Sequence, residues 1–164
     1  MSLLRRFKLY LWYFSHFKVA MIGYTRPRLI AVDDSSIIIR LPLNRRTRNH
    51  LNSMYFGALA VGADMAGGLH GFYHANKAQC KVSLAFKSFQ AQFLKRPESD
   101  VYFICHEGEV VKTMISESKK TGVRINKAIH IKAYTGYLEP QQEEVAHFTL
   151  ELSLKVNTPL SINP

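Results

Sequence analysis

The chain of 164 residues carries 22 Lys and Arg residues against 12 Asp and Glu residues, a formal net charge of +10, and 47% of its residues are hydrophobic. This composition describes one globular domain and excludes a disordered or fibrous chain. Ten of the basic residues but only two of the acidic ones lie in residues 1–50. The N-terminal third is therefore expected to meet an anionic partner. Nucleic acid is not expected, because the sequence contains no helix-turn-helix, zinc-ligand or RNA-binding motif.

The first predicted element is a basic, aromatic-rich amphipathic helix in residues 3–22, within an N-terminal segment that spans 1–26. Lysines interrupt its apolar run and no cleavage site follows, which argues against a signal peptide and a membrane-spanning helix. Apolar residues recur at helical spacing, namely Leu4, Phe7, Leu11 and Phe14. We expect this face to cover the domain's own core or a second subunit. The alternative is a helix that lies on a membrane surface.

Pro27 begins the main domain, which is predicted to span 27–157 and to open with two short strands. β-Branched residues in 28–34 and 36–42 flank a cluster of two Asp and two Ser residues, a pattern typical of a hairpin with a polar turn. A basic loop, residues 44–49, leads to a long run of small and apolar residues that ends at Gly68. Asn52 and Ser53 are both candidates for the N-cap of the helix predicted there.

This helix is predicted to be the centre of the fold. Residues 57–68 contain eight Gly and Ala residues. Glycine weakens an exposed helix by about 1 kcal/mol relative to alanine, whereas small side chains let a buried helix approach another backbone closely. We therefore expect the helix to be buried and wrapped by a flat element. Asp64 is the only carboxylate within it, and because a buried carboxylate without a partner is costly, it requires either a partner or a functional role.

The second half of the chain is predicted to form four strands and one short helix. Apolar residues alternate in 82–93, 101–105, 123–133 and 146–156, and a change of parity near Lys87 and Ser88 predicts a β-bulge there. A helical period begins at Glu109 and ends before Gly122. The predicted fold class is α+β, with one antiparallel sheet wrapped around the glycine- and alanine-rich helix. Residues 158–164 are predicted to be a tail.

Two further pairs of residues are expected to be structural. Cys80 and Cys105 lie in apolar runs and are predicted to be free, buried thiols in a reducing compartment, the cytoplasm. His70 and His74 are four residues apart, as two metal ligands on one helix face would be, but no third ligand accompanies them. No metal site is predicted.

Residues 48–58 are Arg-Asn-His-Leu-Asn-Ser-Met-Tyr-Phe-Gly-Ala, and Asp64 follows Gly57 by seven positions. This stretch resembles the hotdog-fold thioesterase superfamily, in which a sheet wraps a glycine-rich helix. It is similar to the pattern Arg-Asn-x-x-Gly-Thr-x-Phe-Gly-Gly of an uncharacterised branch. The phenylacetyl-CoA thioesterase-like branch carries Asn-x-x-Gly-x-x-His-Gly-Gly and an acidic residue seven positions after the last glycine. Gly57 and Asp64 keep that spacing, while Asn52, Tyr55 and Phe56 depart from the pattern.

The resemblance implies a thioester hydrolase. It implies that Asp64 is the general base or nucleophile and that the backbone N–H groups of Phe56 and Gly57 form an oxyanion hole. Asn49 would orient substrate or water. Contacts with the substrate are implied for seven further residues, with the arginines holding coenzyme A phosphates: Tyr55, Asn52, Ser83, Ser88, Arg45, Arg46 and Arg48.

The resemblance also implies a homodimer or a dimer of dimers that acts on an acyl-coenzyme A or a related thioester. No cofactor is implied beyond the coenzyme A of the substrate, and no metal. The departures at Asn52 and Tyr55 leave a second hypothesis open, a non-catalytic acyl-binding protein of the same fold. Contact with a membrane surface through residues 3–22 is compatible with either hypothesis.

Overall fold

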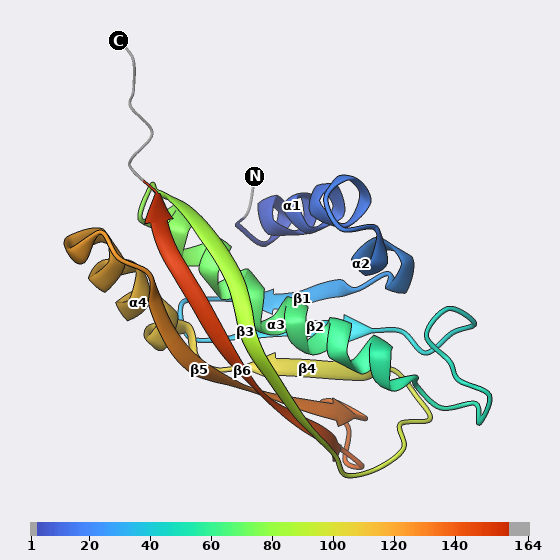
Figure 1. Ribbon diagram of the computed structural model, residues 1–164. Helices are drawn as coiled ribbons and strands as arrows, with labels where there is room; N and C mark the ends of the chain where they lie inside the picture. Colours follow the sequence, from blue (N-terminus) through green and yellow to red (C-terminus); the bar gives the residue numbers. More distant parts are fainter. Residues whose placement is uncertain (1–2, 158–164) are drawn as a thin grey trace.

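The computed structural model describes residues 3–157, so the predicted tail at 158–164 lies outside the described residues. Ten elements follow one another along the described chain: α1 (Leu3–Phe17), α2 (Ala20–Thr25), β1 (Arg28–Val32), β2 (Ile37–Leu41), α3 (Phe56–Lys77), β3 (Lys81–Phe93), β4 (Val101–Cys105), α4 (Gly108–Thr121), β5 (Ile125–Thr135) and β6 (Glu143–Asn157). The strands form one antiparallel sheet in the order β1-β2-β4-β5-β6-β3. Figure 1 shows this sheet curving around α3, which confirms the predicted α+β class with a wrapped central helix.

The predicted β-bulge is present in β3. The register of β3 against β6 shifts between Phe86 and Ser88. Because side chains alternate between the two faces of a strand, the extra residue turns Phe89 and Phe93 to the inner face. Their rings meet the buried ring of Phe148, with centroids 5.7 and 6.2 Å away. The bulge therefore lets one long strand direct apolar side chains of both parities toward the same face of the sheet.

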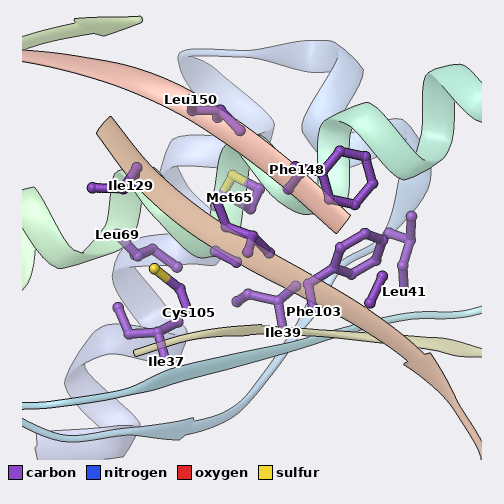
Figure 2. Close-up of a cluster of buried hydrophobic side chains, with 14 of the residues drawn as sticks. Ile37, Ile39, Leu41, Met65, Leu69, Phe103, Cys105, Ile129, Phe148 and Leu150 are labelled. Carbon is purple, nitrogen blue, oxygen red and sulfur yellow. The ribbon is translucent and has the colours of Figure 1, made fainter. Parts of the chain in front are cut away.

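The hydrophobic core lies between α3 and the concave face of the sheet. Figure 2 shows side chains from β2, β4, β5 and β6 converging on Met65 and Leu69 of α3. The strands contribute eight of the labelled residues, all of them buried: Ile37, Ile39, Leu41, Phe103, Cys105, Ile129, Phe148 and Leu150. Full burial of one large apolar side chain stabilises a fold by about 1.5–3 kcal/mol. This cluster is therefore the main source of stability for the domain.

α3 begins later than predicted, at Phe56. Its N-cap is Tyr55, in an extended conformation and without a side-chain capping hydrogen bond. Asn52 instead adopts a left-handed conformation with φ 61°. The Ser53 amide donates to Asn49 Oδ1 over 3.2 Å. The prediction of an N-cap at Asn52 or Ser53 is wrong because Asn49 holds this stretch in a turn that ends before the helix starts.

α1 covers the domain's own central helix, as its apolar periodicity predicts. Phe7 and Leu11 are only 6% and 5% exposed. The ring of Phe7 lies 5.4 Å from that of Tyr73, and the ring of Tyr10 lies 5.4 Å from that of Phe72, both on α3. Among residues 3–157, no helix is both long enough and apolar enough to cross a bilayer.

The turn between β1 and β2 is docked on the C-terminal half of α3. Asp34 accepts hydrogen bonds from the Tyr73 hydroxyl over 2.6 Å and from Lys77 Nζ. The imidazole Nε2 of His74 lies 3.1 Å from the Asp34 carbonyl oxygen. The Gly108 amide, at the start of α4, donates to Ser35 of the same turn. These contacts hold the edge of the sheet, α3 and α4 together at one end of the domain.

Candidate active site

Asp64 lies on α3 and lines a cavity of about 250 Å³. The cavity lies between α1 and α2 on one side and β3 on the other, with α3 as its floor. Its remaining walls are aromatic and aliphatic, and they include Tyr10, Phe14, Ile22, Phe72, Leu84 and Phe86. Asp64 is the one ionisable carboxylate among the residues that line it. The site therefore combines a single acidic group with an apolar enclosure.

The carboxylate of Asp64 has no partner among residues 3–157, since neither a hydrogen bond nor an ion pair to it is present there. Burial raises the pKa of Asp64 above its ordinary value, and no neighbouring charge offsets this effect. A carboxylate that is ionised in such surroundings is a stronger base than one in water. Because Asp64 has no structural partner in the described chain, a functional role is the remaining explanation for this buried carboxylate.

The first turn of α3 offers backbone donors. The amides of Ala58 and Leu59 donate to the Tyr55 carbonyl over 2.9 and 3.1 Å. The amides of Phe56 and Gly57 precede them and have no carbonyl one turn earlier in the helix to accept their hydrogen bonds. They also lie at the positive end of the helix dipole. The ring of Tyr55 packs so tightly against Gly57 that a Cβ at this glycine would lie 2.4 Å from Tyr55 Cε1.

The Asp64 carboxylate and the backbone donors at Phe56 and Gly57 are not brought together within one chain. Gly57 and Asp64 are seven residues apart on α3, which corresponds to about 10 Å along the helix axis at 1.5 Å per residue. Of the residues predicted to form the site, Asp64 alone lines the cavity. A single chain therefore does not place the predicted base and the predicted oxyanion donors around the same atom.

Asn49 and Asn52 shape the loop that precedes α3. The Asn49 carboxamide oxygen accepts hydrogen bonds from the amides of Leu51 and Ser53, over 2.8 and 3.2 Å. Its Nδ2 group donates to Ser53 Oγ over 3.1 Å. Asn52 is exposed at the tip of this loop. The Asn49 side chain is thus engaged in local hydrogen bonds in this structure.

Ser83 and Ser88 lie on β3 but not in the cavity. The Ser83 hydroxyl accepts a hydrogen bond of 3.0 Å from Arg124. The same guanidinium donates to the Ser153 carbonyl oxygen over 3.0 Å. Ser88 is exposed just beyond the bulge. Ser83 thus bridges β3 to β6 through Arg124.

Of the three arginines in the loop before α3, Arg46 reaches the N-terminal helices. Its guanidinium lies 5.2 Å from the centre of the Tyr24 ring and 3.5 Å from the Tyr24 carbonyl oxygen. Arg45 and Arg48 are exposed. None of the three lines the Asp64 cavity.

No family model matches the sequence, and no curated protein matches it. Solved structures do. A protein of unknown function from Pseudomonas aeruginosa, described as a probable thioesterase, is 19% identical, with a TM-score of 0.73 over 91% of this chain and 95% of that one. A protein of unknown function from Chlorobaculum tepidum is 14% identical, with a TM-score of 0.80 over 94% and 97%. A thioesterase from Haemophilus influenzae is 14% identical, with a TM-score of 0.65 over 100% and 96%. The chain has the hotdog fold.

In this hotdog domain the walls that α1 and α2 contribute to the cavity were not foreseen from the sequence. Tyr10, Val19 and Ile22 face Asp64 from segments more than forty positions away in the chain. The helical spacing of Phe7 and Leu11 indicated an inward face, but it carried no information on which part of the domain that face covers. Nothing in the sequence marks an apolar residue such as Val19 or Ile22 as part of a cavity wall rather than of the general core.

Both histidines of the central hotdog helix have structural partners. Nε2 of His70 lies 3.1 Å from the Cys105 carbonyl oxygen, so the neutral ring donates its N–H to it. Its Nδ1 atom is buried and has no hydrogen-bond partner among residues 3–157. Burial lowers the pKa of His70 to about 4 and also lowers the pKa of His74. Within the described chain, no group of three or more His, Cys, Asp or Glu side chains is arranged to hold a metal.

His70 is expected to make the domain unstable in acid. Its pKa is about 4 in the folded chain against an ordinary value of 6.5, so the unfolded chain binds the proton more tightly. Its contribution to stability is therefore complete above pH 6.5 and is lost as the pH falls toward 4, by about 3 kcal/mol in total. Urea unfolding at a series of pH values measures this slope. In His70→Gln the slope between pH 6.5 and 4 should shrink, and an unchanged slope would assign the acid sensitivity to other groups.

Proposed function

We propose that this protein hydrolyses an acyl-coenzyme A or a related thioester, with Asp64 as the general base or nucleophile. The observation that carries the proposal is the Asp64 carboxylate, which has no partner in the described chain and lines an apolar cavity of about 250 Å³. The likeness in fold to proteins described as thioesterases supports it. A thioester substrate presents an apolar acyl chain for the cavity walls and an electrophilic carbonyl for the carboxylate.

The proposed reaction needs no group beyond the chain and water. The Asp64 carboxylate takes a proton from a water molecule while the water oxygen bonds to the thioester carbonyl carbon. The oxyanion that forms accepts hydrogen bonds from the amides of Phe56 and Gly57 at the helix N-terminus. The C–S bond then breaks, the thiolate takes up the proton, and the products are a carboxylic acid and a free thiol.

We further propose that a second copy of the chain completes the site. Gly57 and Asp64 of one protomer are too far apart to act on one carbonyl, so one of the two groups must come from a partner. Within the part of the chain that the structure describes, β3 is an edge strand of 13 residues that pairs with β6 alone. It leaves Phe89 and Phe93 43% and 50% exposed, and a long apolar edge of this kind readily pairs with another strand. Leu84 and Phe86 of the same strand line the cavity, so a partner across β3 would lie next to Asp64.

The variant Phe89→Glu is expected to be monomeric and inactive, because a charge on the β3 edge opposes burial against a second copy. Light scattering coupled to size-exclusion chromatography measures the mass, and circular dichroism checks the fold. The matched control is Leu138→Glu, which adds the same charge at a residue that is 81% exposed in the β5–β6 turn. A wild-type monomer that turns over substrate would refute the shared site.

Thiol release from short-chain, medium-chain, long-chain and aromatic acyl-coenzyme A substrates tests the proposed activity directly. Turnover on at least one of them is expected, and the preferred chain should be one that the apolar cavity can enclose. A folded protein with no turnover on any of these substrates, or on the matching thioesters of a carrier protein, would refute the proposal.

One observation favours a second candidate, a non-catalytic acyl-binding protein. The Tyr55 ring lies against Gly57, next to the backbone donors that the reaction requires. A ring held there would leave the cavity able to bind an acyl chain while it blocks the oxyanion site. Saturable binding of an acyl-coenzyme A without thiol release would support this candidate, and turnover that appears in Tyr55→Ala would identify the ring as the block.

A further inference from the structure

The N-terminal helices have a second apolar face that points away from the domain. While Phe7 and Leu11 pack inward, a stripe of large apolar residues remains in contact with solvent. This outer stripe consists of six residues that are each at least 46% exposed: Leu9, Trp12, Tyr13, Phe17, Met21 and Tyr24. Within it, the Phe17 ring contacts the rings of Trp12 and Tyr13, with centroids 6.0 and 5.4 Å away. Exposed apolar clusters of this kind mark interaction sites rather than ordinary protein surface.

A basic pocket adjoins the outer stripe. It has a volume of about 720 Å³ and lies between α1, the end of α2, β1 and the loop before α3. Trp12 of the outer stripe also lines it, so the two features form one surface. No Asp or Glu is among the lining residues, whereas five basic side chains are: Lys8, Arg26, Arg28, Arg40 and Arg46.

Most of the positive charge of this basic pocket is not neutralised by the protein. Arg40 is paired with Asp100, with Nε 2.8 Å from the carboxylate. Arg46 lies over the Tyr24 ring, which leaves its charge in place. Lys8, Arg26 and Arg28 form no ion pair with any part of the chain from residue 3 to residue 157. Four unneutralised cations around one pocket suit a phosphate, because guanidinium groups bind its oxygens in pairs.

We propose that this surface binds anionic membranes: the basic pocket takes the phosphate head group of an acidic phospholipid, and the outer stripe enters the interface of the bilayer. A soluble phosphate would occupy the basic pocket but leave the outer stripe in water. A bilayer of acidic lipids satisfies both features at once, since it offers phosphates next to hydrocarbon. Trp and Tyr side chains favour this interface, where one part of the ring is apolar and the other is hydrated.

The outer stripe and the Asp64 cavity lie on different sides of α1, whereas Leu11 lines both the cavity and the basic pocket. The cavity is lined by Tyr10 and Phe14, whereas the outer stripe contains Leu9 and Tyr13. Residues one position apart on a helix point about 100° away from each other. Membrane binding therefore leaves the cavity in place, and this inference stands whether or not the protein hydrolyses thioesters.

Trp12 is the only tryptophan of the chain, so its fluorescence reports on the surface formed by the outer stripe and the basic pocket. Vesicles of phosphatidylcholine mixed with phosphatidylglycerol are expected to shift the Trp12 emission to shorter wavelength and to protect it from quenching by acrylamide. Vesicles of pure phosphatidylcholine should do neither, and high salt should reverse the effect. Vesicle sedimentation gives the partition coefficient independently of the fluorescence.

Two variants separate the contribution of the basic pocket to membrane binding from that of the outer stripe. Lys8→Gln with Arg28→Gln should weaken partitioning about 25-fold, since each basic residue near an anionic surface contributes about fivefold. Phe17→Ser removes an aromatic ring that is 67% exposed, and should weaken partitioning about tenfold. The matched control is Lys119→Gln with Lys120→Gln on α4, which loses the same charge and lies away from α1 in Figure 1. Unchanged melting temperatures would confirm that each variant is folded.

Each result decides the proposal. Selective binding to the acidic vesicles that fails in the Lys8/Arg28 variant and persists in the control would support it. Unchanged Trp12 emission, equal partitioning into pure phosphatidylcholine, or equal losses in the variant and its control would overturn it. Binding of inorganic pyrophosphate in calorimetry without binding to vesicles would also overturn it, since the basic pocket would then serve a soluble phosphate compound.

Discussion

The variant Asp64→Asn is expected to lower kcat/KM for thioester hydrolysis by about a thousandfold, the usual order for loss of a general base. The amide of Asn has nearly the same shape as the carboxylate but does not take up a proton at neutral pH. The cavity and its apolar walls stay intact, so KM should change little. Thiol release measured beside the wild type tests this expectation with the best substrate of the acyl-coenzyme A series.

Stability provides the control for this variant. Because burial raises the pKa of Asp64, the ionised carboxylate destabilises the folded chain at neutral pH. Asp64→Asn should therefore unfold at a higher urea concentration at pH 7, and the gain should disappear in acid, where Asp64 itself is protonated. Glu98→Gln, at an exposed carboxylate outside the cavity, should alter neither activity nor stability. Full activity of Asp64→Asn in a folded protein would refute the assigned role.

The second large effect is expected at Gly62, where α3 packs directly against the buried ring of Phe103 on β4. A Cβ at this position would lie 2.3 Å from Cε2 and Cζ of Phe103. Phe103 is fully buried and has no room to move aside. The clash should outweigh the gain in helix propensity, so Gly62→Ala should destabilise the domain by about 2 kcal/mol.

Gly68→Ala is the matched control for this substitution, one and a half turns further along the same helix. A Cβ there would meet only the Phe86 ring, at an ordinary contact distance of 3.8 Å. The methyl group should therefore stabilise the domain by about 1 kcal/mol through helix propensity alone. Urea unfolding of both variants measures the difference. A stabilising effect of both substitutions would refute the close contact between Gly62 of α3 and Phe103 of β4.

Several features of the fold could be predicted from the sequence because they depend on local patterns. The run of Gly and Ala residues indicated a buried helix, and α3 is one. The change of parity near Lys87 and Ser88 indicated the bulge in β3. The glycine after two lysines indicated the end of α4, and Gly122 does adopt the left-handed conformation there, with φ 71°.

Other features were not predicted from the sequence, because they depend on which of several possible side-chain contacts forms. Asn52 and Ser53 had the right composition for an N-cap, yet the hydrogen bonds of Asn49 hold them in a turn instead. Arg46 lies over Tyr24 of α2 and lines the basic pocket, a position that the sequence did not indicate, while its contact with coenzyme A phosphates stays a prediction. No spacing along the chain relates the N-terminal helices to this loop.

The sequence by itself determined the wrapped α+β architecture, the small-residue helix and the presence of one carboxylate inside it. These follow from periodicity and residue size, which act over a few neighbouring residues. Only the tertiary structure decided that Asp64 lies in a cavity roofed by α1 and α2, that Gly62 rather than Gly68 tolerates no side chain, and that α1 turns a second apolar face to solvent. Such properties depend on which distant residues pack against each position, and the pattern of neighbouring residues along the chain does not specify them.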